Sequence, residues 1–151
     1  MVGGLAGSFA VLAGAAAVDA TPQFVPTVLA LALFLWTPPH FWSLAAARGD
    51  DYRSAGVPML PLVTPVSVWT LAILTHAAAP LAVSLVPFFY GYGMIYGLGA
   101  GTGGGYFLWK SWLLRCAPTK QNAMANFFAS LVQLSLLIVG VVLQGAFGAW
   151  T

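Results

Sequence analysis

The chain has 151 residues, of which 60% are hydrophobic and 5% charged, with five basic and three acidic side chains. A soluble domain carries about 25% charged residues, so eight charges could not cover a water-facing surface. This composition excludes a soluble globular domain, and the net charge of +2 is too small to indicate a nucleic-acid partner. The apolar runs are about as long as the roughly 20 residues that cross a lipid bilayer as a helix. We predict an all-α, polytopic transmembrane bundle of about five helices.

Five apolar segments, separated by proline, glycine and charged residues, are the expected spans of a single transmembrane domain. They cover residues 3–18, 26–47, 66–89, 91–114 and 122–150. The first is rich in glycine and alanine at spacings of three and four, which favours close contact between helices. The fourth carries a glycine-rich run at 97–105, which indicates either tight packing or a flexible wall.

Two features mark the end of the second span. Pro38 and Pro39 remove backbone donors and are expected to kink the helix, which a membrane tolerates only where the freed carbonyls face protein or water. The kink would direct His40 toward an interior. His40 is either an acid, base or metal ligand, or a hydrogen-bonded packing residue. His76, alone in an apolar span, is interpreted as structural.

Charge is concentrated in the loop at residues 48–65, which holds two of the three acidic residues, Asp50 and Asp51, between Arg48 and Arg53. Charge that an apolar membrane protein keeps together indicates chemistry. Adjacent carboxylates can hold Mg²⁺ through oxygen ligands, and the metal in turn binds a phosphate, to which arginine adds charge-assisted bonds. The alternative is a solvated loop with local charge pairs.

Loops with basic residues alternate along the chain with loops that have none. Arg48 and Arg53 follow the second span, and Lys110, Arg115 and Lys120 lie where the fourth and fifth spans meet, whereas the other two loops hold no Lys or Arg. The positive-inside rule places the charged loop in the cytoplasm. The chain would then enter its first span from the cytoplasm, with Asp19 on the far side.

The stretches WTPPHFWSLA (36–45) and DDYRSAGVPMLPLV (50–63) resemble the signature of the protoheme IX farnesyltransferases, or haem O synthases, which are intramembrane prenyltransferases of the UbiA type. GGLAGSFAVLAGAAA (3–17) is similar to the family's glycine-rich helix, and residues 122–137 are similar to its final helix. One departure lies in the charged loop, where Gly49 replaces the family's usual basic residue.

The resemblance implies transfer of the farnesyl group of farnesyl diphosphate to a vinyl group of haem b, giving haem O for terminal oxidases. Haem b is a substrate rather than a cofactor, Mg²⁺ binds the diphosphate, and haem A synthase is an implied partner. The resemblance also implies roles for individual residues. These are His40 and Asp51 in catalysis, Asp50 and Asp51 in metal binding, and Arg48, Tyr52, Arg53 and Trp36 in substrate binding.

The family has two aspartate-rich motifs, and Asp50 and Asp51 fall at the second. The first would lie upstream, so we expect this chain to be the carboxy-terminal portion of a nine-helix enzyme of the bacterial inner membrane, inactive without the amino-terminal half on the same or another polypeptide. Two alternatives stay open. One is a related prenyltransferase with a quinone or chlorophyllide acceptor, and the other is a non-catalytic haem-binding subunit or assembly factor.

Overall fold

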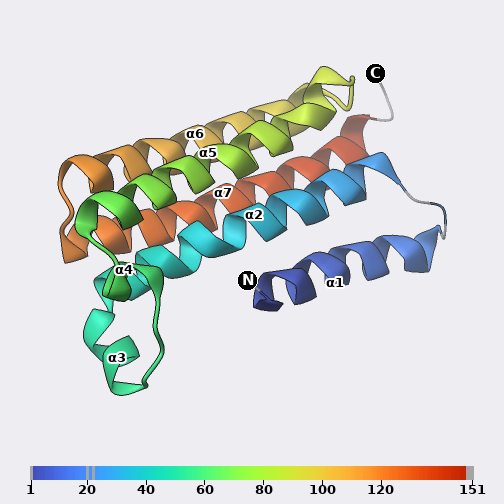
Figure 1. Cartoon of the computed structure of the whole chain (residues 1–151). Helices are drawn as coiled ribbons and strands as arrows, with labels where there is room; N and C mark the ends of the chain where they lie inside the picture. Colours follow the sequence, from blue (N-terminus) through green and yellow to red (C-terminus); the bar gives the residue numbers. More distant parts are fainter. Residues whose placement is uncertain (1, 20, 22, 149–151) are drawn as a thin grey trace.

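A computed structural model describes residues 2–19, 21 and 23–148 (Figure 1). Throughout this described part the regular structure is helical, which confirms the all-α prediction. The helices are α1 (Val2–Val18), α2 (Phe24–Ala47), α3 (Gly49–Ser54), α4 (Leu60–Val63), α5 (Val66–Phe89), α6 (Met94–Cys116) and α7 (Lys120–Phe147).

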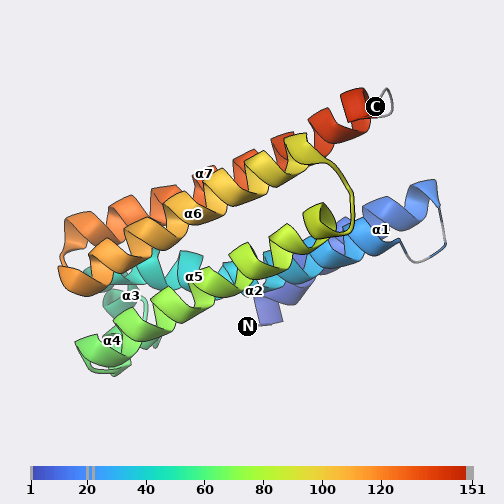
Figure 2. The same ribbon diagram turned by 90° about the horizontal axis from the view of Figure 1, so that it is seen from above.

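The four helices α2, α5, α6 and α7 lie side by side, and α1 lies against α2 (Figures 1 and 2). The short helices α3 and α4 project from one end of this bundle, where the connection between α6 and α7 also lies (Figure 1). The connection between α5 and α6 lies at the opposite end, as do the end of α1 and the start of α2. The two basic connections therefore share one end of the bundle.

Helices α2, α5 and α7 are long and apolar enough to cross a membrane. Helix α1 is apolar but shorter, and α6 has 23 residues with a glycine-rich first half. These five helices lie within or overlap the five predicted segments, and that all five cross the membrane stays a prediction. The sixth and seventh, α3 and α4, lie inside the segment predicted only as a loop.

Four of the five predicted spans differ from the helix bounds by one to three residues at an end, and the starts of α6 and α7 have local causes. Helix α6 begins at Met94 rather than at residue 91, because Gly93 has a φ of 122°, a left-handed conformation that glycine tolerates. Helix α7 begins at Lys120 rather than at residue 122, since the Thr119 hydroxyl accepts a hydrogen bond from the Asn122 amide at 3.1 Å and caps the helix. It ends at Phe147, and residues 149–150 of the predicted span lie outside the described residues.

Helix α2 continues through Pro38 and Pro39 without interruption, and both prolines are buried. His40 is 7% exposed, so the prediction that it faces the interior is confirmed. Interior prolines are acceptable in this helix because it packs against α1, α5 and α7 along its length.

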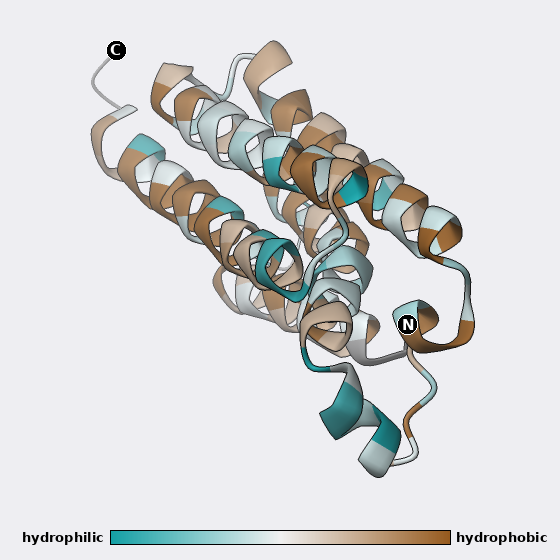
Figure 3. Ribbon diagram, turned by 90° about the vertical axis from the view of Figure 1, so that its left-hand side faces the viewer, coloured by the Kyte–Doolittle hydropathy of each residue, from teal (hydrophilic) through white to brown (hydrophobic). Residues whose placement is uncertain are grey.

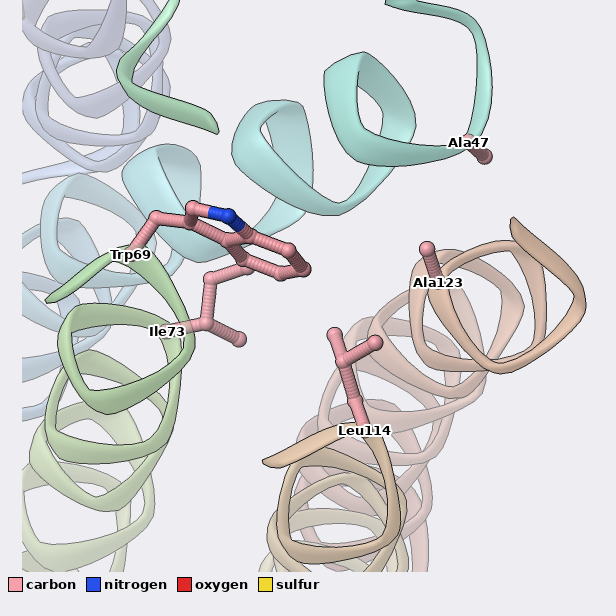
Figure 4. Close-up of a cluster of buried hydrophobic side chains, with 5 residues drawn as sticks. All are labelled: Ala47, Trp69, Ile73, Leu114 and Ala123. Atoms are coloured by element: carbon pink, nitrogen blue, oxygen red, sulfur yellow. The ribbon is translucent and has the colours of Figure 1, made fainter. Parts of the chain in front are cut away.

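One hydrophobic core cluster lies at the α3 end of the bundle (Figure 4). Trp69 and Ile73 of α5 face Leu114 of α6, with Ala47 of α2 and Ala123 of α7 beside them. All five are buried. The cluster ties the end of α2, from which α3 emerges, to the other three helices.

Four glycines of the glycine-rich run, at positions 97, 99, 103 and 104, serve tight packing, which favours the first of the two alternatives that the sequence left open. A Cβ atom added at Gly99 would lie 2.6 Å from the backbone oxygen of Leu136, and one at Gly103 would lie 3.0 Å from the Cα of Gln133. Both contacts are to the backbone of α7, so α6 and α7 approach more closely than larger residues would permit. Gly4 and Gly7 of α1 similarly face α2.

Candidate functional site

The charged residues predicted to carry the chemistry lie on α3 and at Arg48 just before it, and α3 forms a hydrophilic projection at the end of a mostly apolar bundle (Figure 3). Arg53 Nη1 lies 3.2 Å from Asp50 Oδ1, and Arg48 Nη1 lies 3.6 Å from Asp51 Oδ2. Each pair is three residues apart on neighbouring turns, a spacing that brings side chains together on a helix. The structure therefore brings together all four charged residues of the loop in two local pairs.

A fifth charged residue, Lys120 at the start of α7, lies beside these four. Lys120 Nζ lies 3.1 Å from Asp50 Oδ2, so the first residue of α7 contacts a residue 70 positions earlier. From the sequence, Lys120 is interpreted only as a topology signal. The alternation of basic loops was the available signal, since it put Lys120 on the same side as Arg48 and Arg53. We call Arg48, Asp50, Asp51, Arg53 and Lys120 the charged cluster.

The charged cluster is accessible and carries three positive and two negative charges. Its paired side chains are 62–75% exposed. The hydrogen bond from Lys120, followed by its charge, lowers the pKa of the Asp50 carboxyl below its ordinary value. Exposed ion pairs of this kind contribute little to stability. The pairs can therefore open at small cost to admit a charged ligand.

The departure at Gly49 has a steric reason. Gly49 is buried, and a Cβ atom there would lie 3.1 Å from Leu62 Cδ2, tighter than an ordinary contact. A larger side chain would press on Leu62 where α3 packs against α4. Arg48, one position earlier, is exposed and supplies the positive charge on this side of the aspartates.

His40 belongs to a buried seam between α2 and α7 rather than to the charged cluster. Its Nδ1 lies 2.7 Å from Ser130 Oγ, and its ring stacks between Trp36 and Phe127, with centroid distances of 4.1 and 4.5 Å. Trp36 Nε1 donates to the Ser130 backbone oxygen at 2.9 Å. These contacts favour the packing alternative for His40, which also precedes Arg48 by two helical turns, or about 12 Å.

The same seam contains a polar relay that the sequence analysis missed. Asn126 Nδ2 donates to Ser43 Oγ at 2.8 Å, and Ser111 Oγ donates to Asn126 Oδ1 at 2.9 Å. All three residues are fully buried. They link α2, α7 and α6 a few residues from the charged cluster, and polar side chains at membrane depth hold helices together in this way.

Two residues remain from the sequence predictions: Tyr52, predicted to bind substrate, and His76, predicted to be structural. Tyr52 lies on α3 and is partly buried. His76 Nδ1 lies 2.9 Å from the Ala72 backbone oxygen, and its ring meets Trp42 edge-on at 5.0 Å, contacts in keeping with a structural residue.

An apolar cavity of about 180 Å³ lies between α1, α2 and the segment that follows α3. Thr37, Pro38, Phe41 and Trp42 of α2 line it, and Met59 closes the side toward α4. These residues lie within the resemblance stretch, on either side of His40. The stretch therefore joins an exposed charged cluster to apolar space inside the bundle.

The donor chemistry of the charged cluster suits Mg²⁺, which proteins commonly hold through one or two carboxylates together with substrate phosphates. Asp50 and Asp51 are adjacent and exposed. Among the described residues no group of three or more His, Cys, Asp or Glu side chains could form a complete metal cage. The pair thus fits a metal shared with a phosphorylated ligand rather than a fully protein-bound ion.

Apolar helices of membrane-spanning length and a charged cluster at one end define a polytopic membrane protein with a polar site at the bundle end. The profile of the UbiA prenyltransferase family matches residues 1–132, and the chain belongs to this family of membrane-embedded enzymes.

Three curated relatives are similar to this chain over most of its length. The chain is 52% identical over 144 residues, 95% of its length, to "Protoheme IX farnesyltransferase 2" of Paramagnetospirillum magneticum, and 48% identical over 142 residues, 93% of its length, to "Protoheme IX farnesyltransferase 1" of the same organism. It is 40% identical over 136 residues, 89% of its length, to "Protoheme IX farnesyltransferase" of Thioalkalivibrio sulfidiphilus. The matches cover 50%, 50% and 45% of these relatives, so the chain spans about half their length. No solved structure matches the chain significantly.

Proposed function

We propose that this chain forms part of a protoheme IX farnesyltransferase, which transfers the farnesyl group of farnesyl diphosphate to a vinyl group of haem b and so produces haem O. The observation that carries the proposal is the charged cluster, in which an adjacent pair of exposed carboxylates meets three basic side chains at the end of an apolar bundle. The names of relatives up to 52% identical support this choice of reaction.

The basic residues of the charged cluster are the proposed diphosphate contacts. Arg48 and Arg53 can offer paired N–H donors to phosphate oxygens, and Lys120 adds a point charge from α7. Tyr52, on the same short helix, is assigned to the substrate as well. Opening the exposed pairs releases these cations for the ligand at small cost.

Asp50 and Asp51 are the proposed metal-binding pair, with Asp51 also acting in catalysis. A Mg²⁺ ion held there would neutralise the negative charge of the departing diphosphate. The chain's own contribution is to hold both carboxylates on one exposed turn, with Lys120 beside Asp50.

The apolar bundle is proposed to shelter the reacting allylic group from water. Trp36 and His40 are assigned to the substrate side of the site, His40 through its Nε2 atom, because its Nδ1 is engaged by Ser130. The cavity lined by Phe41 and Trp42 provides apolar space along the same stretch of α2.

The test is to express residues 1–151 with and without the amino-terminal half of a related enzyme, and to measure conversion of haem b to haem O. We expect activity only on co-expression, because one carboxylate pair and five long helices supply only part of the charge and of the cavity wall. Activity of the chain by itself would instead require a site built from these residues alone. Haem binding without prenyl transfer in either case would favour a non-catalytic subunit, and transfer to a quinone precursor would favour the other enzyme class.

The proposed setting is the bacterial inner membrane, with residues 48–65 in the cytoplasm and with haem A synthase as the partner that takes up haem O. Reporters fused after Arg53 and after Arg115 should report cytoplasm, and one fused at Tyr90, at the opposite end of the bundle, should report the other side. The reverse pattern would contradict the proposed orientation of the charged cluster.

A further inference from the structure

A groove of about 590 Å³ runs between α5 and α6, and no residue of the charged cluster lines it. Its lining is almost wholly apolar. It includes Leu74, Thr75 and Ala78 of α5, and Gly105, Trp109 and Trp112 of α6. The two tryptophans are 54% and 55% exposed. A Cβ atom at Gly105 would meet nothing within 4 Å, so this glycine leaves the groove open.

Lys110 brings a positive charge to the groove. Its Nζ lies 4.5 Å from the centroid of the Trp109 ring and 5.5 Å from that of Tyr106. A cation over an aromatic face is held electrostatically. The ammonium group is thereby kept beside a ring that lines the groove.

Arg115 brings a second positive charge one helical turn beyond Trp112. Its Nη1 lies 3.4 Å from the Ser67 backbone oxygen and 3.5 Å from Thr70 Oγ1, so it reaches from the end of α6 to the start of α5. This holds the guanidinium group at the end of the groove that faces the bundle end. Other donors of the same group stay available.

Neither basic residue forms an ion pair with any residue that the structure describes. The chain's acidic residues stand at positions 19, 50 and 51, outside α5 and α6, and the last two are paired within the charged cluster. Lys110 and Arg115 thus flank an apolar groove with uncompensated positive charge.

We propose that this groove binds one anionic phospholipid, with an acyl chain along the groove and the headgroup phosphate against Arg115 and Lys110. Basic residues beside a gap between membrane helices suit anionic headgroups, and exposed tryptophan suits the membrane interface. A zwitterionic lipid would fill the apolar groove with an acyl chain but would leave the positive charge of Lys110 and Arg115 uncompensated. A soluble anion would pair with the two basic side chains but would leave the groove and its tryptophans uncovered. This site is separate from the proposed substrate site.

The experiment uses the 151-residue chain purified in mild detergent and native mass spectrometry to count bound lipid. Phosphatidylglycerol and phosphatidylcholine with identical acyl chains are the two probes, and inorganic phosphate is added as a competitor. We expect one tightly bound phosphatidylglycerol, weaker phosphatidylcholine binding, and no displacement by phosphate. Arg115→Gln and Lys110→Gln should each weaken phosphatidylglycerol binding about fivefold, whereas Arg53→Gln, a basic residue outside the groove, should not.

A second pair of variants tests the groove itself. Gly105→Leu should weaken binding of both lipids by filling the open space, while Gly14→Leu, also at an exposed helical glycine with nothing within 4 Å, should leave binding unchanged. Circular dichroism confirms that each variant remains helical. Equal affinity for the two headgroups, or selectivity that survives both Arg115→Gln and Lys110→Gln, would overturn the proposal. A lipid-independent dimer that Gly105→Leu abolishes would overturn it too, by assigning the groove to a second copy of the chain.

Discussion

The substitution Asn126→Leu tests whether the buried polar relay holds the bundle together. Asn126 accepts a hydrogen bond from Ser111 of α6 and donates one to Ser43 of α2, at 2.9 and 2.8 Å, and is fully buried. Leucine has a similar size but makes neither bond. The substitution therefore removes two interhelical hydrogen bonds and leaves little change in packed volume.

The magnitude follows from those two bonds. Hydrogen bonds between membrane helices contribute about 0.6 kcal/mol on average and about 1.7 kcal/mol at most, so the loss lies between about 1.2 and 3.4 kcal/mol. The lower half of this range is expected, because both serines keep a partner. Ser43 still donates to the Pro39 oxygen at 2.6 Å, and Ser111 can donate to the Phe107 oxygen at 3.0 Å.

The effect should also reach the charged cluster. Asn126 stands six residues after Lys120 on α7, and Ser43 stands five residues before Arg48 at the end of α2. Loosening the seam between these helices would weaken the contact between Lys120 and Asp50. In a complete enzyme we expect Asn126→Leu to raise KM for farnesyl diphosphate more than it lowers kcat.

Reversible unfolding in detergent measures the stability change, with Gln121→Leu as control, since it also replaces an amide by leucine on α7 but at an exposed position. A double-mutant cycle with Ser111→Ala isolates the bond to Ser111. If Asn126→Leu unfolds within about 0.3 kcal/mol of the wild type, or if the cycle shows no coupling, the relay does not stabilise the bundle and the reasoning is refuted.

Three further predictions concern the charged cluster and the glycine contacts. In a complete enzyme, Asp50→Asn and Asp51→Asn should each lower turnover by on the order of 10² to 10³ without changing helical content, and full turnover at limiting Mg²⁺ would contradict the metal role. The lowered pKa of Asp50 means that its ion pair with Lys120 stabilises the fold above the carboxyl's unfolded pKa and is lost as pH falls through the folded value. The stability difference between wild type and Asp50→Asn should thus shrink once the pH falls below the carboxyl's ordinary pKa of 3.8 and vanish below the lowered folded value, and a difference that stays constant through this acid range would count against the pair. Gly99→Val, which forces a side chain against the backbone of α7, should cost about 1–3 kcal/mol, unlike Gly145→Val in open space, and equal melting temperatures would show that the close contact is dispensable.

The long helices were predictable from the sequence because their apolar runs end at prolines, glycines and charged residues that act locally. Helix α5 begins and ends at the predicted residues, and the start of α2 is two residues from its predicted position. The errors at α6 and α7 also have local causes, the positive φ of Gly93 and the cap supplied by Thr119. Local sequence signals were therefore sufficient to predict the positions of the long helices to within a few residues.

The site was only partly predictable, because its long-range contacts depend on how each helix is rotated about its axis. The pairs within α3 follow from spacing, whereas the contact of Lys120 with Asp50 requires α7 to start beside α3. The relay through Asn126 likewise requires three helices to turn particular faces to one centre. Composition and periodicity do not specify those rotations.

The pairing of Lys120 with Asp50 also has a consequence for biosynthesis. Seventy residues separate the two partners, so at about 5–20 residues per second the ribosome adds Lys120 about 4–14 s after Asp50. During that interval α2 and α5 can enter the membrane, but Asp50 on α3 has only its neighbour Arg53 as a partner. The charged cluster is complete only when α7 inserts and brings Lys120 to Asp50. Insertion of the last long helix of the described chain is therefore the final step in assembling a site whose other residues lie near the middle of the sequence.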